Sequence, residues 1–222
     1  MFKKVFMPLS IVAVLGAGVF TYSSLQHNKP EKTVATSVKP SSGMPVYISE
    51  GDYISYSTVD SMENASDLVV VATPKKPFEQ RKHVTTYVSD PSGQKFPENS
   101  YTLTDVSIKK VLSAKDSSLS KLKSVSVVEN IGVIKDNDGI NKKLSFEGYE
   151  EMSNKSDYIL YLTKNDNGTY SITNILNGKF DVKAHTVAPK LAEAQREHAS
   201  DHTQFEQQVK AKFKKELAEY TN

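Results

Sequence analysis

The sequence of 222 residues contains no cysteine and no tryptophan, and Arg81 and Arg196 are its only arginines. Without cysteine the chain forms no disulfide bond, so its folded part must be held together by its core alone. Arginine supplies the bidentate contacts to bases that lysine cannot make. Because arginine is scarce and the formal net charge is only +2, we expect no nucleic-acid partner.

Long apolar runs are also few, and the most extended one lies near the N-terminus. Residues 5–25 are uncharged and mostly apolar, and Lys3 and Lys4 precede them. A cationic start followed by an apolar stretch and small residues is typical of a secretory signal. Cleavage at Gly16-Ala17-Gly18 would release the protein, whereas an uncleaved segment is about long enough to span a bilayer, which takes roughly 20 residues. We therefore expect residues 1–25 to be a signal peptide or a signal anchor.

Either outcome would place the rest of the chain outside the cytoplasm, secreted after cleavage or attached to the membrane without it. Residues 26–45 contain three prolines and no apolar periodicity, which predicts a disordered stalk. Residues 46–188 predict a β-rich extracytoplasmic domain, and residues 189–222 predict a C-terminal helix.

The domain contains several segments with the apolar patterns of strands. Residues 68–72 are a continuous apolar run, which predicts a strand buried on both faces or inside a closed barrel. Residues 101–112 alternate with a change of phase, which predicts a β-bulge near Asp105. Asn177-Gly178 predicts a hairpin, because both residues tolerate positive φ. Short extended segments are predicted at residues 47–48 and 53–56, further strands at 83–88, 125–133, 144–146, 158–162, 169–173 and 179–182, and a short helix at 60–65.

Two features of this domain are candidate sites. Residues 73–100 contain four prolines, which argue against a central strand and predict a long surface excursion, where β domains often carry binding residues. Glu129 falls on the same face of its predicted strand as Val127 and Ile131. A carboxylate on a buried face would indicate function, unless a bulge at Val128 turns it outward.

The C-terminal segment predicts one amphipathic helix. On the helix face opposite its apolar stripe, oppositely charged residues are spaced i,i+4, among them Glu206 with Lys210 and Lys212 with Glu216. This spacing predicts a solvated surface. We expect the apolar stripe to pack across the barrel, and a partner-binding or self-associating helix is the alternative. The stripe consists of Leu191, Ala194, His198, Phe205, Val209, Phe213, Leu217 and Tyr220, at three- and four-residue intervals.

His198 and His202 lie at i and i+4 on this helix, a spacing at which two imidazoles can share a metal ion. In a zincin helix, however, a glutamate follows the first histidine as the general base, and Ala199 occupies that place. The chain also contains no nucleotide-binding loop and no nucleophile-elbow motif. We therefore assign no catalytic, cofactor-binding or metal-ligating residue, and a metal-assisted enzyme using His198 and His202 is kept as an alternative.

The order of the structural motifs resembles that of uncharacterised exported proteins of Bacillus-like Gram-positive bacteria. The resemblance covers residues 60–182 and implies a small OB-like β-barrel, without any catalytic residue to carry over. It is carried by the short helix, then Ser66-Asp67-Leu68-Val69-Val70-Val71, Lys109-Lys110-Val111-Leu112, Asp157-Tyr158-Ile159-Leu160-Tyr161-Leu162 and Gly178-Lys179-Phe180.

These observations predict a mainly β fold, a small antiparallel barrel or meander followed by a long C-terminal amphipathic helix. The leading functional hypothesis is a noncatalytic envelope module that binds a protein, a peptide or a wall polymer through the excursion or the terminal helix. The membrane would be a further partner if the N-terminal segment is uncleaved. The alternatives are the enzyme centred on His198 and His202, and self-assembly through the C-terminal helix.

Overall fold

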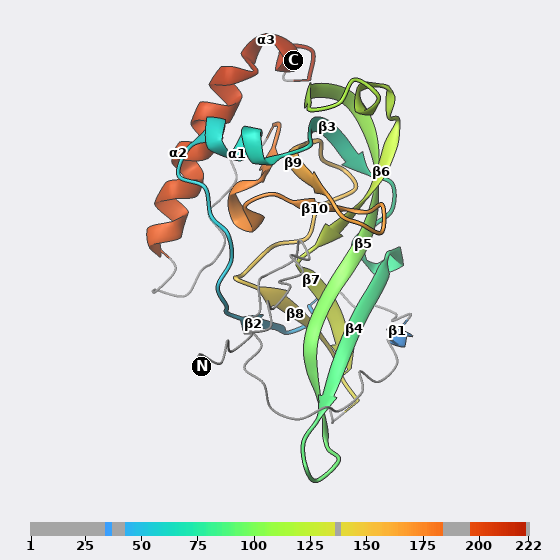
Figure 1. The fold of residues 1–222 in the computed structure, drawn as a ribbon. Helices are drawn as coiled ribbons and strands as arrows, with labels where there is room; N and C mark the ends of the chain where they lie inside the picture. The colour runs from blue at the N-terminus through green and yellow to red at the C-terminus, as the bar shows by residue number, and fades with distance from the viewer. Residues whose placement is uncertain (1–33, 37–42, 136–138, 184–195, 221–222) are drawn as a thin grey trace, which may run out of the picture.

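The computed structural model describes residues 34–36, 43–135, 139–183 and 196–220. They form a mainly β structure with helices packed on one side (Figure 1). In chain order the elements are β1 (Val34–Thr36), β2 (Val46–Ser49), α1 (Val59–Ala65), β3 (Leu68–Pro74), η1 (Phe78–Gln80), β4 (Lys82–Ser89), β5 (Lys95–Ala114), η2 (Leu119–Lys121), β6 (Ser124–Glu129), β7 (Ile131–Lys135), β8 (Asn141–Phe146), β9 (Tyr158–Lys164), β10 (Tyr170–Ile172), η3 (Ile175–Asn177), β11 (Lys179–Asp181), α2 (Arg196–Lys212) and α3 (Lys214–Leu217).

Five strands close into a barrel in the cyclic order β3, β5, β6, β10 and β9. Neighbouring strands are antiparallel except for β6 and β10, which are parallel and complete the closure. The predicted small barrel followed by a C-terminal helix is therefore confirmed, with one parallel pair that the sequence did not indicate.

The two faces of β3 explain its continuous apolar run. Val70 points into the barrel and belongs to the core cluster there, whereas Val69 and Val71 belong to a second cluster outside the barrel wall. The same division holds on β9, where Leu160 joins the inner cluster and Ile159 the outer one. Because successive side chains of a strand point to opposite faces, a strand between two cores is apolar at every position.

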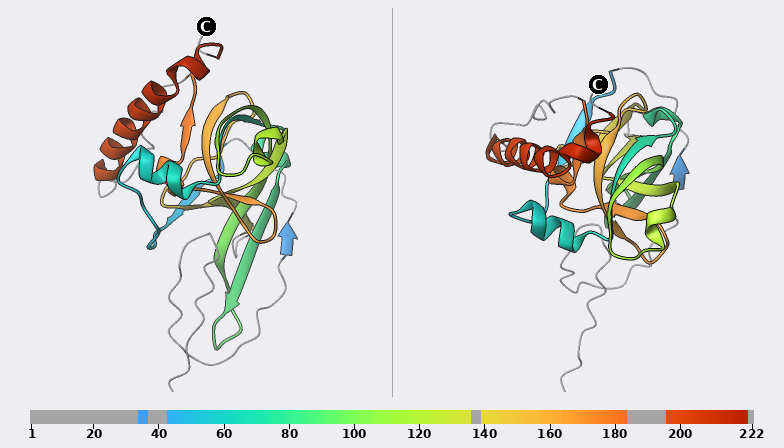
Figure 2. Two further views of the ribbon diagram at one scale, coloured as in Figure 1. Left: turned by 45° about the horizontal axis from the view of Figure 1, so that its top comes forward. Right: turned by 90° about the horizontal axis from the view of Figure 1, so that it is seen from above.

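The outer cluster is covered by the helices, and Figure 2 shows α1 and α2 on the same side of the barrel. Phe205, Val209, Phe213 and Leu217 are buried there against the barrel strands. The prediction that the helix stripe packs across the barrel is thus confirmed for the part of the stripe with described side chains, from Phe205 onward. The predicted continuous helix is interrupted at Phe213, between the end of α2 and the start of α3.

Ion pairs also join the helices to the rest of the protein. Glu206 and Lys210 pair within α2, as their spacing predicts, but Glu206 is buried, so the predicted solvated surface is wrong at this position. Lys212 pairs instead with α1, its Nζ lying 2.7 Å from Asp60 and 2.6 Å from Glu63. The pair of Lys212 with Asp60 is exposed, and an exposed ion pair contributes on the order of 0–1 kcal/mol, so the buried stripe contributes more to helix docking than this pair does.

A second sheet, in the order β2, β8, β7, lies against the barrel. Its strand β7 approaches β5 closely because Gly132 has no side chain. A Cβ atom on Gly132 would lie 2.1 Å from Oγ of Ser100 and 2.8 Å from the backbone nitrogen of Tyr101. The Thr102 hydroxyl of β5 also donates to the Ile131 carbonyl of β7, at 2.5 Å. The second sheet is thereby fixed to the barrel wall.

Replacing Gly132 with alanine is expected to destabilise the protein by about 1–3 kcal/mol, because the added methyl group has to displace backbone as well as the Ser100 side chain. Urea unfolding followed by circular dichroism measures this change. Gly51→Ala is the control, since its Cβ would meet only the movable ring of Phe146, at 3.1 Å. Equal stability of the two variants would contradict the close approach of β7 to β5.

The β-bulge predicted near Asp105 is placed wrongly, since the register shifts of this part of β5 lie further along the strand, where its pairing with β3 shifts between Ile108 and Lys110 and between Val111 and Ser113. The β5–β6 pairing runs past Asp105 without a shift in register. Thr102 and Thr104 are fully buried on the face that continues into Val106, whereas Leu103 lies on the opposite face. The apparent change of phase arose because the inward-facing positions of this stretch carry hydroxyl groups instead of apolar side chains.

The predicted hairpin at Asn177-Gly178 is also wrong, because β11 pairs with β9 and not with β10. The left-handed residue is Asn174, with φ of 62°, whereas φ of Gly178 is −109°. A Cβ atom on Gly178 would lie 1.7 Å from the Thr173 carbonyl oxygen. Glycine is therefore present for a close backbone contact and not for a turn with positive φ.

Several predictions concern residues outside the described ones. The signal or anchor segment (1–25), most of the stalk (26–45) and residues 189–195 of the predicted helix belong to this group. Within the predicted stalk, however, Val34–Thr36 form β1, which pairs antiparallel with β4. In the part of the chain that the structure describes, no helix is both long and apolar enough to cross a membrane.

Candidate functional site

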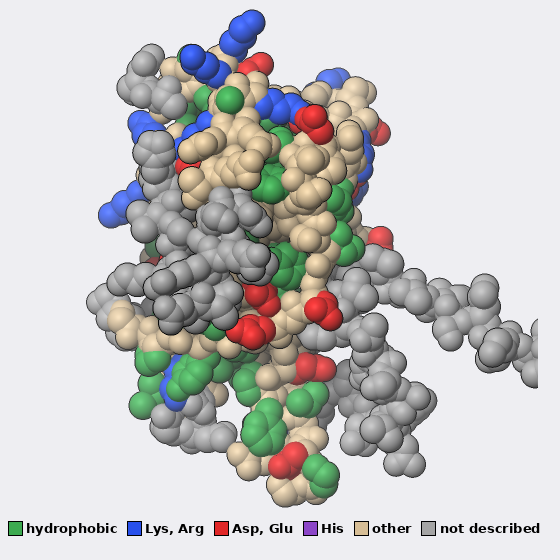
Figure 3. Space-filling view, turned by 90° about the vertical axis from the view of Figure 1, so that its left-hand side faces the viewer, with side chains coloured by type: hydrophobic (Ala, Val, Ile, Leu, Met, Phe, Trp, Pro, Cys, Tyr) green, Lys and Arg blue, Asp and Glu red, His purple; other side chains and the backbone are tan. Residues whose placement is uncertain are grey.

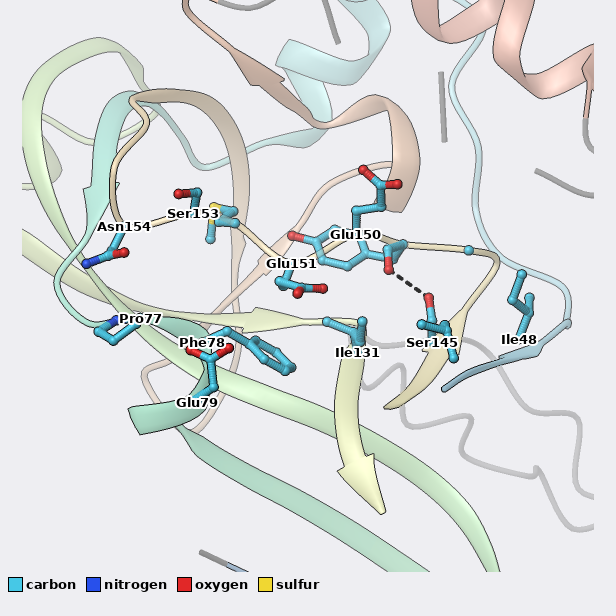
Figure 4. A pocket seen from close by; sticks show the side chains of 14 residues that line it. Ile48, Pro77, Phe78, Glu79, Ile131, Ser145, Glu150, Glu151, Ser153 and Asn154 are labelled. Carbon is cyan, nitrogen blue, oxygen red and sulfur yellow. Dashed lines mark hydrogen bonds between the residues drawn. The ribbon is translucent and has the colours of Figure 1, made fainter. Parts of the chain in front are cut away.

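A pocket of about 730 Å³ lies between the second sheet and the segment that leads from β8 to β9 (Figure 4). Two lining residues come from β2, the outer strand of the sheet, and one each comes from β8 and β7. The remaining walls come from residues 77–79, which include the start of η1, and from residues 148–154. The pocket is lined by Val46, Ile48, Pro77, Phe78, Glu79, Ile131, Ser145, Gly148, Tyr149, Glu150, Glu151, Met152, Ser153 and Asn154.

The lining is apolar inside and acidic at its border. Phe78 and Ile131 are buried, and Figure 4 shows the Phe78 ring directed toward Ile131. Glu79 and Glu150 are exposed, and Glu151 is half-buried in an ion pair with a lysine. Figure 3, which shows the side of the molecule that carries β2, has acidic side chains next to apolar ones on its lower half.

A buried ion pair supports the inner wall of the pocket. Arg81 and Glu129 are joined by a contact of 2.6 Å between Nη1 and Oε1, with side chains 2% and 0% exposed. The second carboxylate oxygen of Glu129 accepts from the Tyr149 hydroxyl at 3.1 Å and from the Met152 backbone N–H at 2.7 Å. Nη2 of Arg81 donates to the Met152 carbonyl at 2.6 Å. The ion pair thus fixes two residues of the pocket lining.

Arg81 and Glu129 also have hydrogen-bond partners outside the pocket lining. The Thr104 hydroxyl donates to Oε1 of Glu129, and Nε of Arg81 donates to the Lys76 carbonyl at 2.9 Å. Burying two charges is costly unless their remaining hydrogen-bonding capacity is met, which is the case here. Burial, and next the carboxylate of Glu129, raise the pKa of Tyr149 well above its ordinary value, so its hydroxyl stays protonated and able to donate.

Two lysines lie over the aromatic rings of the pocket. Nζ of Lys143 lies 5.0 Å from the centre of the Phe78 ring, and Nζ of Lys179 lies 3.9 Å from that of Tyr149. Lys179 also donates to the Glu150 carbonyl. Burial lowers the pKa of Lys179 to about 8, against the opposing effect of Glu129. The protein's own lysines therefore already lie over these two rings. A positively charged ligand would be attracted by the carboxylates at the border of the pocket instead.

A row of buried polar side chains continues from the ion pair along β4 and β5. Nδ1 of His83 lies 2.9 Å from the Thr102 hydroxyl, and the hydroxyls of Thr85 and Ser100 are also 2.9 Å apart. Burial, and next the charge of Arg81, lower the pKa of His83 to about 4, so its imidazole is neutral at physiological pH. These side chains bind each other and join β4 to β5 and β7, which indicates a structural role.

The buried position predicted for Glu129 is confirmed, and Val128 is not bulged, because the β5–β6 register is continuous there. The predicted excursion, residues 73–100, is only partly correct. Its second half is a hairpin of β4 and β5 that projects from the body of the protein (Figure 1). Pro97 is tolerated within β5 beside a shift of register opposite Tyr87. Within the excursion, the lining of the pocket comes from residues 77–79 alone.

Of the two histidines on which the alternative of a metal-assisted enzyme rests, only His202 has a described side chain. His202 is buried, stacks on Phe180 with 5.2 Å between the ring centres, and lies 3.0 Å from Oδ1 of Asn177. Burial lowers its pKa. The side chain of His198 lies outside the described part. The described residues contain no group of three or more histidine, cysteine, aspartate or glutamate residues that could hold a metal ion.

The pocket itself was not found from the sequence. Its border residues Glu150 and Glu151 belong to a polar loop without a motif, and Glu79 lies some seventy residues earlier in the chain. Comparisons with protein-family models, curated proteins and solved structures gave no match. The function is therefore inferred from the geometry of the pocket.

Proposed function

We propose that this protein is a noncatalytic, extracytoplasmic module that binds a polypeptide segment in the pocket between the second sheet and residues 148–154. The observation that carries this proposal is an apolar pocket bordered by exposed carboxylates. Apolar walls with a few polar groups at the border are typical of ligand sites. Such a site suits a basic segment that also presents apolar groups, because its charges are attracted to the border while its apolar surface is buried.

The chemistry of the lining supports binding rather than catalysis. The residues that line the pocket include no histidine and no cysteine, and the buried ion pair of Arg81 and Glu129 behind its wall uses its hydrogen-bonding capacity within the pair and on neighbouring protein groups. The helix stripe that was an alternative binding surface is buried against the barrel. The pocket is therefore the better-supported site among those that the sequence and the structure suggest.

The N-terminal segment supports an extracytoplasmic location for this activity. A cationic start and the apolar residues 5–25 support export, followed either by release or by attachment to the membrane. The partner would then be a polypeptide of the cell envelope or one that reaches its outer side. A wall polymer is less favoured, because hydroxyl-rich chains gain little from an apolar pocket.

Selection of randomised peptides displayed on phage against the purified full-length protein tests this function. We expect basic peptides to be enriched. Glu79→Lys should weaken their binding about threefold to tenfold and reduce its dependence on salt, because the variant reverses a charge at the border of the pocket.

Glu98→Lys is the matched control, since Glu98 is also exposed but lies on the projecting hairpin. It makes the same change of net charge without touching the pocket. Selected peptides that bind both variants equally well would contradict the proposed site. Failure to enrich any basic peptide would contradict the proposed function itself.

A further inference from the structure

The strand β2 forms one border of the pocket and is the outermost strand of the second sheet. It pairs with β8 along one edge, and among the described residues no strand pairs with its other edge. An unpaired edge presents a row of backbone N–H and C=O groups on which another strand can be added.

The hydrogen bonds to β8 determine which residues present these groups. The backbone N–H of Lys143 donates to the Pro45 carbonyl, and that of Glu147 donates to the Ser49 carbonyl, at 2.9 Å and 2.8 Å. Along a strand, successive residues direct their N–H and C=O groups to opposite edges. Pro45 and Ser49 face β8, so the N–H and C=O groups of Val46 and Ile48 face the free edge.

The same two residues direct their side chains to the pocket. Val46 and Ile48 both line it, and they are 55% and 43% exposed. Between them, Tyr47 belongs to the opposite face of the strand, where Nζ of Lys142 lies 5.0 Å from the centre of its ring. A strand added at this edge would therefore have one face toward the pocket and one toward Tyr47.

Acidic side chains border the pocket face. Glu79 and Glu150 lie at the pocket, and the chain that leaves β2 carries Glu50 and Asp52, all four of them exposed. Basic side chains of an added strand are attracted on this face, where their aliphatic stems can also lie along apolar residues.

We propose that the ligand is an extended segment that adds to β2 as a fourth strand of the second sheet, with basic residues at alternate positions facing the pocket. This inference rests on the proposed function and specifies the ligand of the same site. A second copy of the protein is a less favourable occupant, because pairing β2 with β2 would bring two acidic borders together.

A capped peptide of alternating lysine and valine is the probe, and a peptide of the same composition with its lysines and valines in two blocks is the control. The alternating peptide should bind the full-length protein more tightly. Methylating one alternating set of its amide nitrogens should weaken binding about threefold to tenfold per site, while methylating the other set should leave it unchanged. Which of the two sets of amides is sensitive to methylation also shows whether the added strand runs parallel or antiparallel to β2.

On the protein side, Ile48→Pro removes an N–H from the free edge but no hydrogen bond to β8, so an edge strand should tolerate it. It should weaken binding at least as much as one sensitive N-methyl group. Ile48→Ala, which keeps the N–H, should weaken binding less.

Peptide binding that is insensitive to methylation of either set would overturn the strand addition and leave the proposed function standing. The inference would also be overturned if light scattering showed a dimer of the free protein that Ile48→Pro abolishes. No binding of the alternating peptide, together with no enrichment of basic peptides from the phage library, would overturn the proposed function as well.

Discussion

Replacing Arg81 with methionine is expected to lower the free energy of unfolding by about 3–5 kcal/mol, a large share of the stability of a domain of this size. The reason is the carboxylate that would be left behind. Glu129 is fully buried, and Arg81 is its only cationic partner among the described ion pairs. Without the guanidinium, the folded state has to bury an uncompensated charge or take up a proton.

A double variant separates the effect of the uncompensated charge from the effect of the lost packing. Adding Glu129→Gln to Arg81→Met removes the uncompensated charge but keeps an oxygen that accepts from Tyr149 and Met152. The double variant should therefore be more stable than Arg81→Met alone. Urea unfolding measures all three proteins. A double variant that is no more stable than the single one would contradict this account of the ion pair.

Lys109→Met is the matched control for Arg81→Met. The ion pair between Lys109 and Asp157 is more exposed, with side chains 42% and 15% exposed, and its loss should cost about 1 kcal/mol or less. The contrast between the arginine and the lysine replacement then measures the effect of burial. Because the ion pair holds Tyr149 and Met152, Arg81→Met should also reduce binding at the pocket.

Replacing Phe180 with alanine is expected to destabilise the protein by about 3–5 kcal/mol, an effect as large as that of Arg81→Met but of different origin. Phe180 lies on β11 and is fully buried in the outer cluster, between the barrel and the helices. Its ring makes an edge contact with Tyr161, with centres 6.4 Å apart, and stacks on His202 of α2. Alanine would leave a cavity where the helix meets the barrel wall.

Phe96→Ala makes the same substitution on the projecting hairpin, where the ring is 42% exposed, and should change stability by about 0.5 kcal/mol or less. Urea unfolding followed by far-ultraviolet circular dichroism measures both variants. A small effect of Phe180→Ala, equal to that of Phe96→Ala, would show that the helices do not share a core with the barrel.

The sequence indicated those elements whose apolar pattern is complete. The strand β3 was predicted because both its faces are apolar, and the helix stripe because Phe205, Val209 and Phe213 recur at helical spacing. β5 was predicted with the wrong faces, since Thr102 and Thr104 point inward. Threonine hydroxyl groups on an inner face add nothing to the apolar periodicity of a sequence. Whether they are buried depends on hydrogen-bond partners from distant strands.

The candidate site was less accessible to sequence reasoning for the same physical reason. Glu129 could be placed on a buried face, but its partner Arg81 lies 48 residues earlier in the chain. The strand β2 was predicted, but its position at the edge of a sheet was not. That position depends on the parallel pairing of β2 with β8, which no short sequence pattern indicates. The pocket exists only once these segments have come together.

Hydrogen exchange of the amide protons of β2, measured by nuclear magnetic resonance, tests the central claim most directly. In the free protein, the Tyr47 amide is bonded to β8, whereas those of Val46 and Ile48 face the open edge. Adding the alternating lysine–valine peptide should slow the exchange of Val46 and Ile48 and leave that of Tyr47 nearly unchanged. Unchanged exchange at Val46 and Ile48 in the presence of bound peptide would contradict the strand addition.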